Sequence, residues 1–316
     1  MSPDKLLILG QTALELGLVN ALTVLALFLS YSMLNVCDLS TDGCFTLGSA
    51  VGAIVAIAGY PWLSLPAAML AGAISGFITA TLQTRMGVQS LLAGIVVNTG
   101  LYSVNMALTG NKPTLTLNKT PTVFVYAKDL LHGTPLQSQY ILFVLLIAVA
   151  LAVVFLCLFL RTKLGLAIRA TGSNADMVRS SSINPTFTTT VGLCLSNMLT
   201  ALSGCLMVQQ QKSYDINKGS GMVTVALASL LIGGVIFGKH KSIPLRLLGA
   251  VIGAFLFRLV YTLALRFNMP AFMLKAVSSV IVIIALSGSY FKDQLPFIIK
   301  RLKGLGKEDV PNAAAR

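Results

Sequence analysis

The sequence predicts an all-α, polytopic membrane protein of about nine transmembrane or re-entrant helices arranged as an inverted repeat. First, 55% of its 316 residues are apolar and only 10% are charged, whereas soluble domains average about 25% charged residues. Second, its apolar stretches have roughly the 20 residues that a helix needs to cross about 30 Å of hydrocarbon. Third, a glycine pattern recurs in two parts of the chain. The composition excludes a soluble enzyme, a disulfide-stapled secreted domain and a disordered chain.

Nine apolar runs bounded by polar residues, Gly or Pro define the expected helices in order. They cover residues 11–35, 44–60, 62–83, 88–108, 140–160, 187–209, 222–238, 244–265 and 270–290. The first run is longer than a signal-peptide core, so we expect it to stay in the mature protein. The runs at 44–60 and 222–238 are short, and the sequence leaves open whether they span the membrane fully or are re-entrant.

The Lys and Arg residues predict the orientation. If the C-terminus is cytoplasmic, fourteen of them lie on the cytoplasmic side and seven on the opposite side, as the positive-inside rule requires. Tyr60 and Trp62 then fall at the outer interface, where amphipathic rings are enriched. The +13 net charge is thus explained by loops in a lipid bilayer, and we expect the N-terminus outside and no nucleic-acid partner.

The glycine pattern indicates two related halves. Gly72-Ala-Ile-Ser-Gly76 recurs as Gly249-Ala-Val-Ile-Gly253, each in the third of four segments, and polar approaches at 38–43 and 215–221 precede each second segment. Gly-x-x-x-Gly alone is common where membrane helices pack, so the placement carries the prediction. Pairing segments 1–4 with 6–9 around segment 5 gives inverted halves, as in many transporters.

The predicted domain organisation follows from this pairing. We expect one transmembrane domain over residues 1–291, with repeat halves at about 11–108 and 187–290 and a cytoplasmic loop at 161–186. The remaining residues, 292–316, form a basic cytoplasmic tail.

The loop at 161–186 is too polar to cross the membrane and predicts two short helices. The first covers residues 163–170, with Gly172 closing it in the left-handed conformation. Ser173 and Asp176 then form a capping box for the second. The loop also carries the apolar residues Leu164, Leu166, Ile168 and Met177. We expect another protein to bind this helix pair; the alternative is that it lies on anionic lipid.

The same loop resembles the coupling-loop signature of permease subunits of ABC importers of the branched-chain amino acid and ribose type. The matching residues are Thr162, Gly165, Ala167, Ile168, Arg169, Ala170, Gly172, Asn174, Ile183 and Asn184. Similarity extends to residues 38–48, 92–98, 101–105 and 199–204, whereas Val178 and Ser182 depart from the signature. The likeness is greatest to permeases of tryptophan/tyrosine importers.

This resemblance implies a multi-pass subunit of the bacterial plasma membrane that passes an amino acid, aromatic in that group, into the cytoplasm. It implies three partners: a separate ABC ATPase, an extracytoplasmic substrate-binding protein, and a second copy or a similar permease. The expected ATPase-coupling residues are Lys163, Gly165, Ala167, Arg169, Gly172, Asn174, Asp176 and Arg179. We expect no cofactor, no metal and no enzymatic activity of its own.

The residues themselves support a separate source of energy. The run from Gly233 to Lys239 matches most of a nucleotide-binding P-loop, but His240 replaces the Ser or Thr that binds Mg²⁺. His132 and His240 stand alone, and the five cysteines lack metal-ligand spacing. Of ten acidic residues only Glu15 falls inside a predicted segment, which disfavours a proton-driven carrier.

Five residues are candidates for the translocation path: Asn98, Asn105, Asn197, Arg258 and Lys275. Arg258 and Lys275 fall in the outer third of their segments, where a cation can meet a substrate carboxylate. Alternatively, both side chains snorkel to the headgroups. The three amides can instead hydrogen-bond between helices, as can Gln209. A channel or secondary carrier of inverted-repeat architecture for a small polar solute remains the alternative function.

Overall fold

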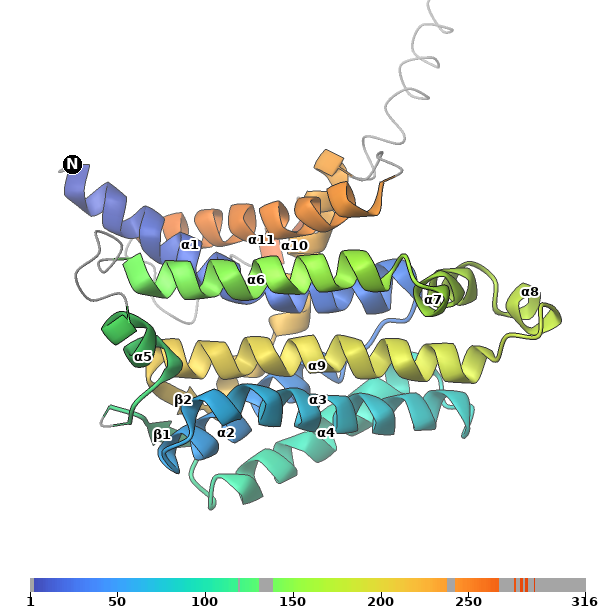
Figure 1. Cartoon of the computed structure of the whole chain (residues 1–316), viewed down its shortest axis with the longest axis horizontal. Coiled ribbons are helices and arrows are strands. Elements are labelled where there is room, and N and C mark those ends of the chain that lie inside the picture. Colours follow the sequence, from blue (N-terminus) through green and yellow to red (C-terminus); the bar gives the residue numbers. More distant parts are fainter. Residues whose placement is uncertain are drawn as a thin grey trace, which may run out of the picture.

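The computed structural model describes residues 3–118, 120–130, 139–237 and 242–266, and the single positions 276, 279, 280, 282, 283 and 287. Long helices lie side by side in an elongated bundle (Figure 1). Among the described residues, seven helices are long and apolar enough to cross a membrane. The predicted segment 270–290 is described only at the single positions, and Lys275 and the predicted tail at 292–316 lie outside the described residues.

The helices of the first half follow one another directly. They are α1 (Pro3–Leu27), which continues as the π-helix η1 (Phe28–Met33), then α2 (Thr41–Ile57), α3 (Pro61–Thr84) and α4 (Ser90–Leu108). The connecting part contains β1 (Thr114–Thr116), α5 (Val123–Leu130), α6 (Tyr140–Phe159), α7 (Lys163–Ser173) and α8 (Ala175–Ser180). The second half contains α9 (Pro185–Gln211), β2 (Ser213–Asp215), η3 (Ile216–Gly219), α10 (Met222–Phe237) and α11 (Ile243–Arg266).

The predicted segments from 44–60 to 244–265 begin and end within three residues of these helices. The first segment was predicted to begin at residue 11, but α1 begins at Pro3. The prediction of an all-α, polytopic membrane fold is therefore confirmed.

A two-stranded sheet closes one end of the bundle, opposite the end that carries α7 and α8 (Figure 1). Strands β1 and β2 pair antiparallel, with Leu115 opposite Tyr214. Tyr214 is buried with Leu117 against alanines of α2. This sheet, which the sequence reading did not predict, brings the chain after α4 next to the end of α9.

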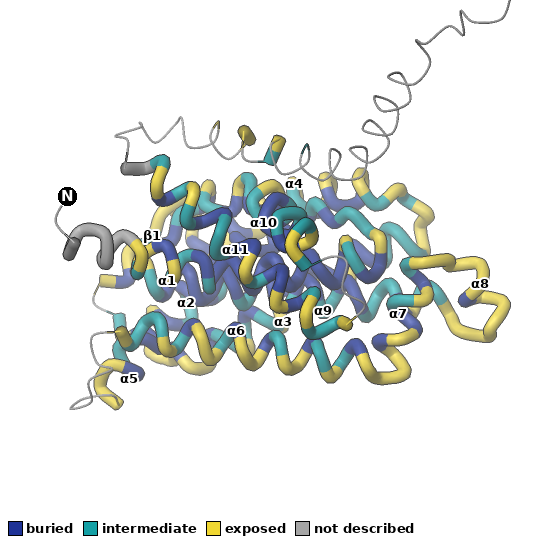
Figure 2. The backbone as a smooth tube through the Cα atoms, turned by 90° about the horizontal axis from the view of Figure 1, so that it is seen from above, coloured by how far each residue is buried: buried dark blue, intermediate teal, exposed yellow. Residues whose placement is uncertain are grey.

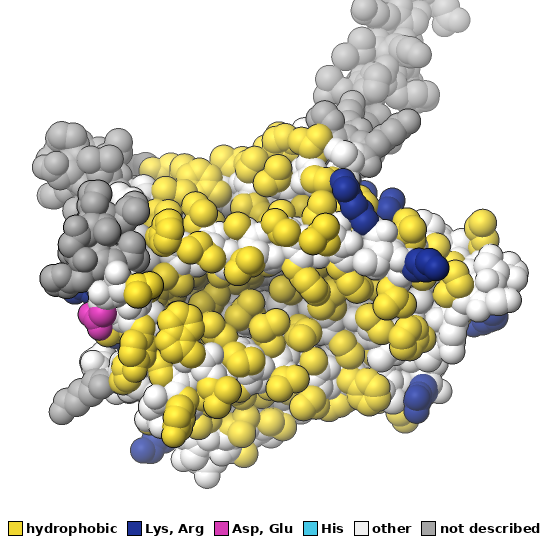
Figure 3. All heavy atoms as spheres, in the orientation of Figure 1, with side chains coloured by type: hydrophobic (Ala, Val, Ile, Leu, Met, Phe, Trp, Pro, Cys, Tyr) yellow, Lys and Arg dark blue, Asp and Glu magenta, His cyan; other side chains and the backbone are white. Residues whose placement is uncertain are grey.

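Helix α1 lies at the centre of the bundle. The residues from Val19 of α1 to Leu29 of η1 are almost completely buried, and α1 packs against α6, α9, α10 and α11. A helix that is apolar on all sides gains most when it is surrounded by other helices. Figure 2 shows the buried interior and the more exposed outer helices. On the outside, apolar side chains cover most of the described surface on one face (Figure 3), as expected for contact with lipid.

The two Gly-x-x-x-Gly motifs both allow close helix packing, but against different partners. A Cβ atom on Gly72 of α3 would lie 2.4 Å from the Asn197 carbonyl oxygen of α9, and one on Gly253 of α11 would lie 2.1 Å from the Ser229 carbonyl oxygen of α10. In the predicted pairing, α9 corresponds to α1 and α10 to α2. The two motifs are therefore not equivalent in their contacts.

Helices α2 and α10 both begin inside the protein. The first turn of α2 lies against Asn197, near the middle of α9, because the Cys44 Sγ donates to the Asn197 carbonyl oxygen. From there α2 runs to the sheet end, where Gly52 packs on Cys205, whereas α10 ends beside α11, where Phe237 lies against Gly249. Helix α2 has 17 residues and is shorter than the seven candidate spans, whereas α10 together with η3 (Ile216–Phe237) is one of them. Because both α2 and α10 begin inside the protein, we call them half-helices.

Candidate translocation junction and coupling face

The approach to α2 is anchored by a buried carboxylate. Asp38 is completely buried; one of its oxygens accepts hydrogen bonds from the Ser40 backbone N–H (2.8 Å) and hydroxyl (2.6 Å). Its other oxygen accepts one from the Asn197 side-chain amide at 2.9 Å. Because buried polar groups need hydrogen-bond partners, these three donors stabilise Asp38 in the interior. They hold the start of α2 against the middle of α9.

A second carboxylate joins α2 to α10. Asp42, in the first turn of α2, accepts hydrogen bonds from the backbone N–H groups of Gly221 (2.9 Å) and Val223 (2.8 Å). The first N–H groups of a helix have no partner within that helix, and its N-terminal end favours negative charge. Gly219 also lies against α2, since a Cβ atom there would be 2.5 Å from the Asp42 carbonyl oxygen. The N-terminal ends of the two half-helices therefore meet, and we name this meeting point, with Asp38 and Asp42, the junction.

The three asparagines predicted for the path surround the first turn of α2. The Asn105 amide donates to the Gly43 carbonyl oxygen at 3.3 Å, and Asn98 Oδ1 lies 2.7 Å from where a Cβ atom on Gly43 would be. Asn197 binds Asp38 from the side of α9. The Oδ1 atoms of Asn105 and Asn197 are buried without a hydrogen-bond partner among the described residues. The structure thus brings these residues together and leaves two acceptors free.

Arg258 lies elsewhere, in the contact between α11 and α1. It is 8% exposed, its guanidinium stacks over the Tyr261 ring at 5.0 Å, and its Cβ faces Gly17 of α1. The Nε atom has no hydrogen-bond partner among the described residues. This burial within the protein argues against snorkelling. Lys275, the other predicted cation, lies outside the described residues.

The count of acids within the predicted segments, which included only Glu15, left out the two junction carboxylates Asp38 and Asp42. Asp38 and Asp42 stand in the polar approach to α2, which the hydropathy pattern places outside the apolar run. Glu15, in turn, accepts hydrogen bonds from Gln11 and Gln210 at 3.1 Å each. The available signal was the Asp-Leu-Ser-Thr-Asp-Gly sequence directly ahead of a small-residue helix. The acid count therefore no longer disfavours a proton-driven carrier.

The predicted helix pair in the loop at 161–186 is present as α7 and α8, but its caps differ from the prediction. Thr162 caps α7 by accepting from the Gly165 N–H at 3.2 Å. Asn174, not Ser173, caps α8: its Oδ1 accepts from the Asp176 and Met177 N–H groups at 3.0 Å each. Ser173 is instead the last residue of α7. The predicted capping box is wrong because α7 extends three residues beyond Ala170.

Gly172 is also needed for a different reason than predicted. It does not adopt a left-handed conformation but lies inside α7 against the end of η1. A Cβ atom there would be 2.0 Å from the Met33 carbonyl oxygen and 2.8 Å from Leu34. Thr171 adds a 2.8 Å hydrogen bond to Thr188 of α9. The helix α7 is therefore held tightly to η1 and to α9.

The outer side of α7 and α8 is exposed and partly apolar. Leu164, Leu166 and Met177 are exposed, whereas Ile168 belongs to the core. Most of the Lys and Arg side chains visible in Figure 3 gather at this end. Of the predicted coupling residues, the following are exposed: Lys163, Asn174, Asp176 and Arg179. Gly165 and Ala167 are buried, and Arg169 is half-buried. We name the exposed side of α7 and α8 the coupling face.

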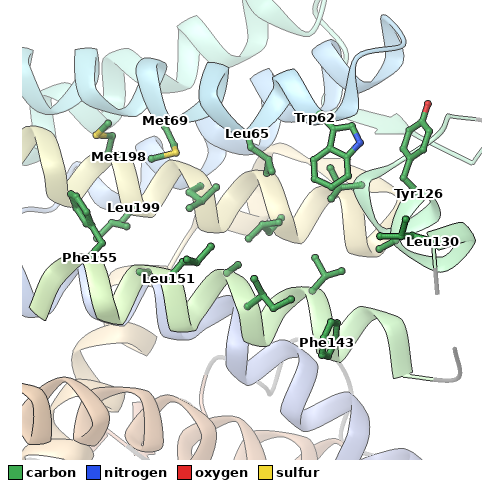
Figure 4. Close-up of a pocket in the computed structure, with 18 of the residues that line it drawn as sticks. Trp62, Leu65, Met69, Tyr126, Leu130, Phe143, Leu151, Phe155, Met198 and Leu199 are labelled. Carbon is green, nitrogen blue, oxygen red and sulfur yellow. The ribbon is translucent and has the colours of Figure 1, made fainter. Parts of the chain in front are cut away.

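A large groove between α3, α5, α6 and α9 has a different character. It has a volume of about 880 Å³ and an almost entirely apolar lining. In Figure 4, Trp62 and Met69 of α3 lie across from Leu151 and Phe155 of α6. Since this lining offers a polar solute almost no hydrogen-bond partner, the groove does not suit the passage of one.

Comparisons with known proteins agree with this architecture. A protein-family model described as "Branched-chain amino acid transport system / permease component" matches residues 12–286. A tyrosine transport system permease protein of Clostridioides difficile (strain R20291) is 30% identical over 273 residues, which cover 84% of this chain and 86% of the relative. The ribose import permease protein RbsC of Escherichia coli (strain K12) is 28% identical over 225 residues, or 69% of this chain and 65% of the relative.

The fructose import permease protein FruF of Bifidobacterium longum (strain NCC 2705) is 25% identical over 248 residues, or 71% of this chain and 65% of the relative. No solved structure matches significantly. The family match spans most of the chain, including both half-helices and the coupling face. The chain therefore belongs to the family of permease components of branched-chain amino acid transport systems, which are multi-pass membrane subunits of ABC transporters.

Proposed function

We propose that two copies of this chain form the membrane path of an ABC importer in the bacterial plasma membrane, which passes an aromatic amino acid from a binding protein into the cytoplasm. A separate ATPase drives the cycle. One observation carries the substrate class: the tyrosine permease is 30% identical over more than four fifths of both chains. The ribose and fructose relatives are less similar and match a smaller part of this chain.

The junction supports a polar route through the bundle. We assign the path to Asn98, Asn105, Asn197 and Arg258, and to Lys275 beyond the described residues. The unpaired Oδ1 atoms of Asn105 and Asn197 are acceptors that suit an ammonium group. Arg258 offers a buried cation for a carboxylate. Broken helices that meet at mid-depth are the usual place for such a site in transporters of inverted-repeat build.

The coupling face supports transmission from an ATPase to this route. We propose that the ATPase binds the exposed apolar side chains of α7 and α8 together with the basic residues beside them. Because Gly172 is packed on Met33 and Leu34, a movement of α7 displaces the end of η1. Asp38 lies only four residues beyond Leu34 and holds the start of α2. A short, contiguous set of contacts thus joins the coupling face to the junction.

The orientation can be tested by labelling. With the coupling face in the cytoplasm and the sheet end outside, Lys112→Cys should react with an impermeant thiol reagent in intact cells. Ser180→Cys should react only after permeabilisation, since both positions are exposed in the structure. The parent chain must carry Ser at the five native cysteines, which are otherwise free thiols. The opposite labelling pattern would place the coupling face outside and exclude the proposed ATPase contact.

Uptake in reconstituted vesicles tests the transport function. Vesicles that contain this chain, its ATPase and its binding protein should accumulate labelled tyrosine or tryptophan only when ATP is supplied on the side of the membrane that carries the ATPase. Ribose should not compete with this uptake. A channel or secondary carrier would transport without ATP and without the ATPase. Uptake of that kind would contradict the proposal, and strong competition by ribose would contradict the substrate class alone.

A further inference from the structure

A polar pocket lies between the coupling helix α7 and the helices η1 and α11, and Leu166 of the coupling face is part of its lining. It has a volume of about 510 Å³ and is lined by η1, Asn35, α7 and Arg246 of α11. Two cations face it: Arg169 of α7 and Arg246 of α11. Arg246 is held in place, because it donates to the Ser32 hydroxyl at 2.8 Å and stacks over the Phe28 ring at 5.5 Å.

This pair of cations has no anionic partner among the described residues. The pocket lining contains no Asp or Glu in the described part of the chain. The one ion pair among the described residues joins Arg179 to Asp176, two exposed residues of α8 outside the pocket. The two guanidinium groups carry the same charge and line the same pocket. Two guanidinium groups that share a half-buried pocket without a counter-charge are stabilised when an anion with several acceptor oxygens binds between them.

The surroundings of the pocket favour a lipid as the source of that anion. On α11, exposed apolar side chains follow Arg246 along the helix at Leu248 and Ile252, and Leu245 precedes it. Leu245, about 100° around the helix from Arg246, is the closest of these side chains to the pocket side of α11, so a phospholipid acyl chain can lie at the edge of the pocket while the phosphate reaches Arg246. Tyr31, which is 41% exposed at the rim, suits the headgroup region. Basic pockets between transmembrane helices are known to bind anionic headgroups in general.

We propose that the pocket between η1, α7 and α11 binds the phosphate group of an anionic phospholipid through Arg169 and Arg246. The bound phosphate bridges the coupling helix α7 to α11 and offsets the repulsion between the two guanidinium groups. This assigns Arg169 an inward role: it fixes α7 through a lipid, whereas the exposed residues of the coupling face meet the ATPase. The proposal concerns binding and does not depend on the transported substrate.

Lipid titration of the purified full-length chain tests this site. Short-chain phosphatidylglycerol, short-chain phosphatidylcholine and inorganic phosphate are titrated into the detergent-solubilised protein, and binding is measured by native mass spectrometry. The wild type should retain one phosphatidylglycerol in preference to phosphatidylcholine. Arg246→Gln and Arg169→Gln should each weaken this binding by about tenfold or more, the size of one lost charge-assisted contact. Arg246→Lys should keep most of it.

The matched control is Arg161→Gln, which removes the same charge from an exposed position at the same end. It should leave phosphatidylglycerol binding unchanged. If Arg161→Gln weakens binding as much as the pocket variants do, the lipid is attracted by the general surface charge and the proposed site is wrong. Thermal unfolding of each variant distinguishes lost binding from lost folding. Competition by millimolar inorganic phosphate would assign the pocket to a soluble anion, and displacement of the lipid by the purified ATPase subunit would assign it to a protein contact. Either result overturns the lipid assignment.

Discussion

The half-helices α2 and α10 begin at the same place but are held from opposite ends of the molecule. The approach to α2 comes from the α7–α8 end, and α7 packs closely on the preceding η1 where Gly172 contacts Met33. The approach to α10 comes from the sheet end, where β2 pairs with β1 and Asp215 caps η3 through the Asn217 N–H at 2.9 Å. Asp42 then links the two starts.

This difference shows that the surroundings of α2 and α10 are not chemically equivalent. The first half supplies both junction carboxylates, Asp38 and Asp42, and no described acid of the second half caps α2 in return. The second half supplies the buried cation Arg258. A movement at the coupling face therefore reaches the junction through α2, while the β-sheet holds the approach to α10.

Removal of Asp42 should have the largest effect, because it breaks the link between the half-helices. Asp42→Ala leaves the N–H groups of Gly221 and Val223 without their acceptor, and we expect a loss of about 3 to 6 kcal/mol of stability for two hydrogen bonds to a charged group. Uptake should be abolished. Thermal unfolding in detergent and vesicle uptake measure the two effects.

The controls for this variant are Asp42→Asn, which keeps one acceptor and should lose less, and Asp129→Ala at an exposed position of α5. Asp129→Ala should behave like the wild type. An Asp42→Ala protein of normal stability and normal uptake would show that the cap on α10 has no role.

Gly172→Val should break the approach to α2 alone. The new side chain would collide with the Met33 carbonyl oxygen, a backbone atom that cannot rotate away, so α7 must separate from η1. We expect insertion in the membrane to persist and ATPase association or uptake to fall by about tenfold or more, equivalent to at least about 1.4 kcal/mol. Ala170→Val, at an exposed position of the same helix, controls for the lower helix propensity of valine. Equal activity of the two variants would exclude the proposed transmission through Met33.

Arg258→Leu should have the smallest effect, because it leaves both half-helices in place. If the guanidinium accepts a substrate carboxylate, uptake should fall by about fivefold, or about 1 kcal/mol, while complex assembly is unchanged. Arg258→Lys, which keeps the charge, should recover part of the uptake. Wild-type uptake by Arg258→Leu would limit this residue to its contacts with Tyr261 and Gly17.

Much of the fold could be predicted from local sequence. Helix ends from α2 to α11 follow the apolar runs to within three residues, because the requirement to cross hydrocarbon acts on each stretch separately. The helix pair α7–α8 was likewise predictable from its polar, patterned loop. The sheet formed by β1 and β2 was not, since three-residue strands about 100 positions apart carry no local signal.

The candidate site was only partly predictable. Asn98, Asn105 and Asn197 were identified because amides are conspicuous in apolar segments. Asp38 and Asp42 were missed because their depth depends on where a non-helical stretch runs through the bundle. Gly172 was singled out correctly as a glycine that matters, but the physical cause was wrong: the requirement comes from a contact with η1, which is some 140 residues away.

Local sequence is enough to predict the class of protein, the positions of the membrane helices and the polar residues available to a path. Those properties depend on composition and on short-range periodicity, which each segment carries alone. Three contacts are known from the tertiary structure alone. The helices α2 and α10 meet at their N-terminal ends, Asp42 of α2 caps the start of α10, and α7 packs closely on η1. Such contacts depend on the close approach of distant backbones, which no single segment encodes.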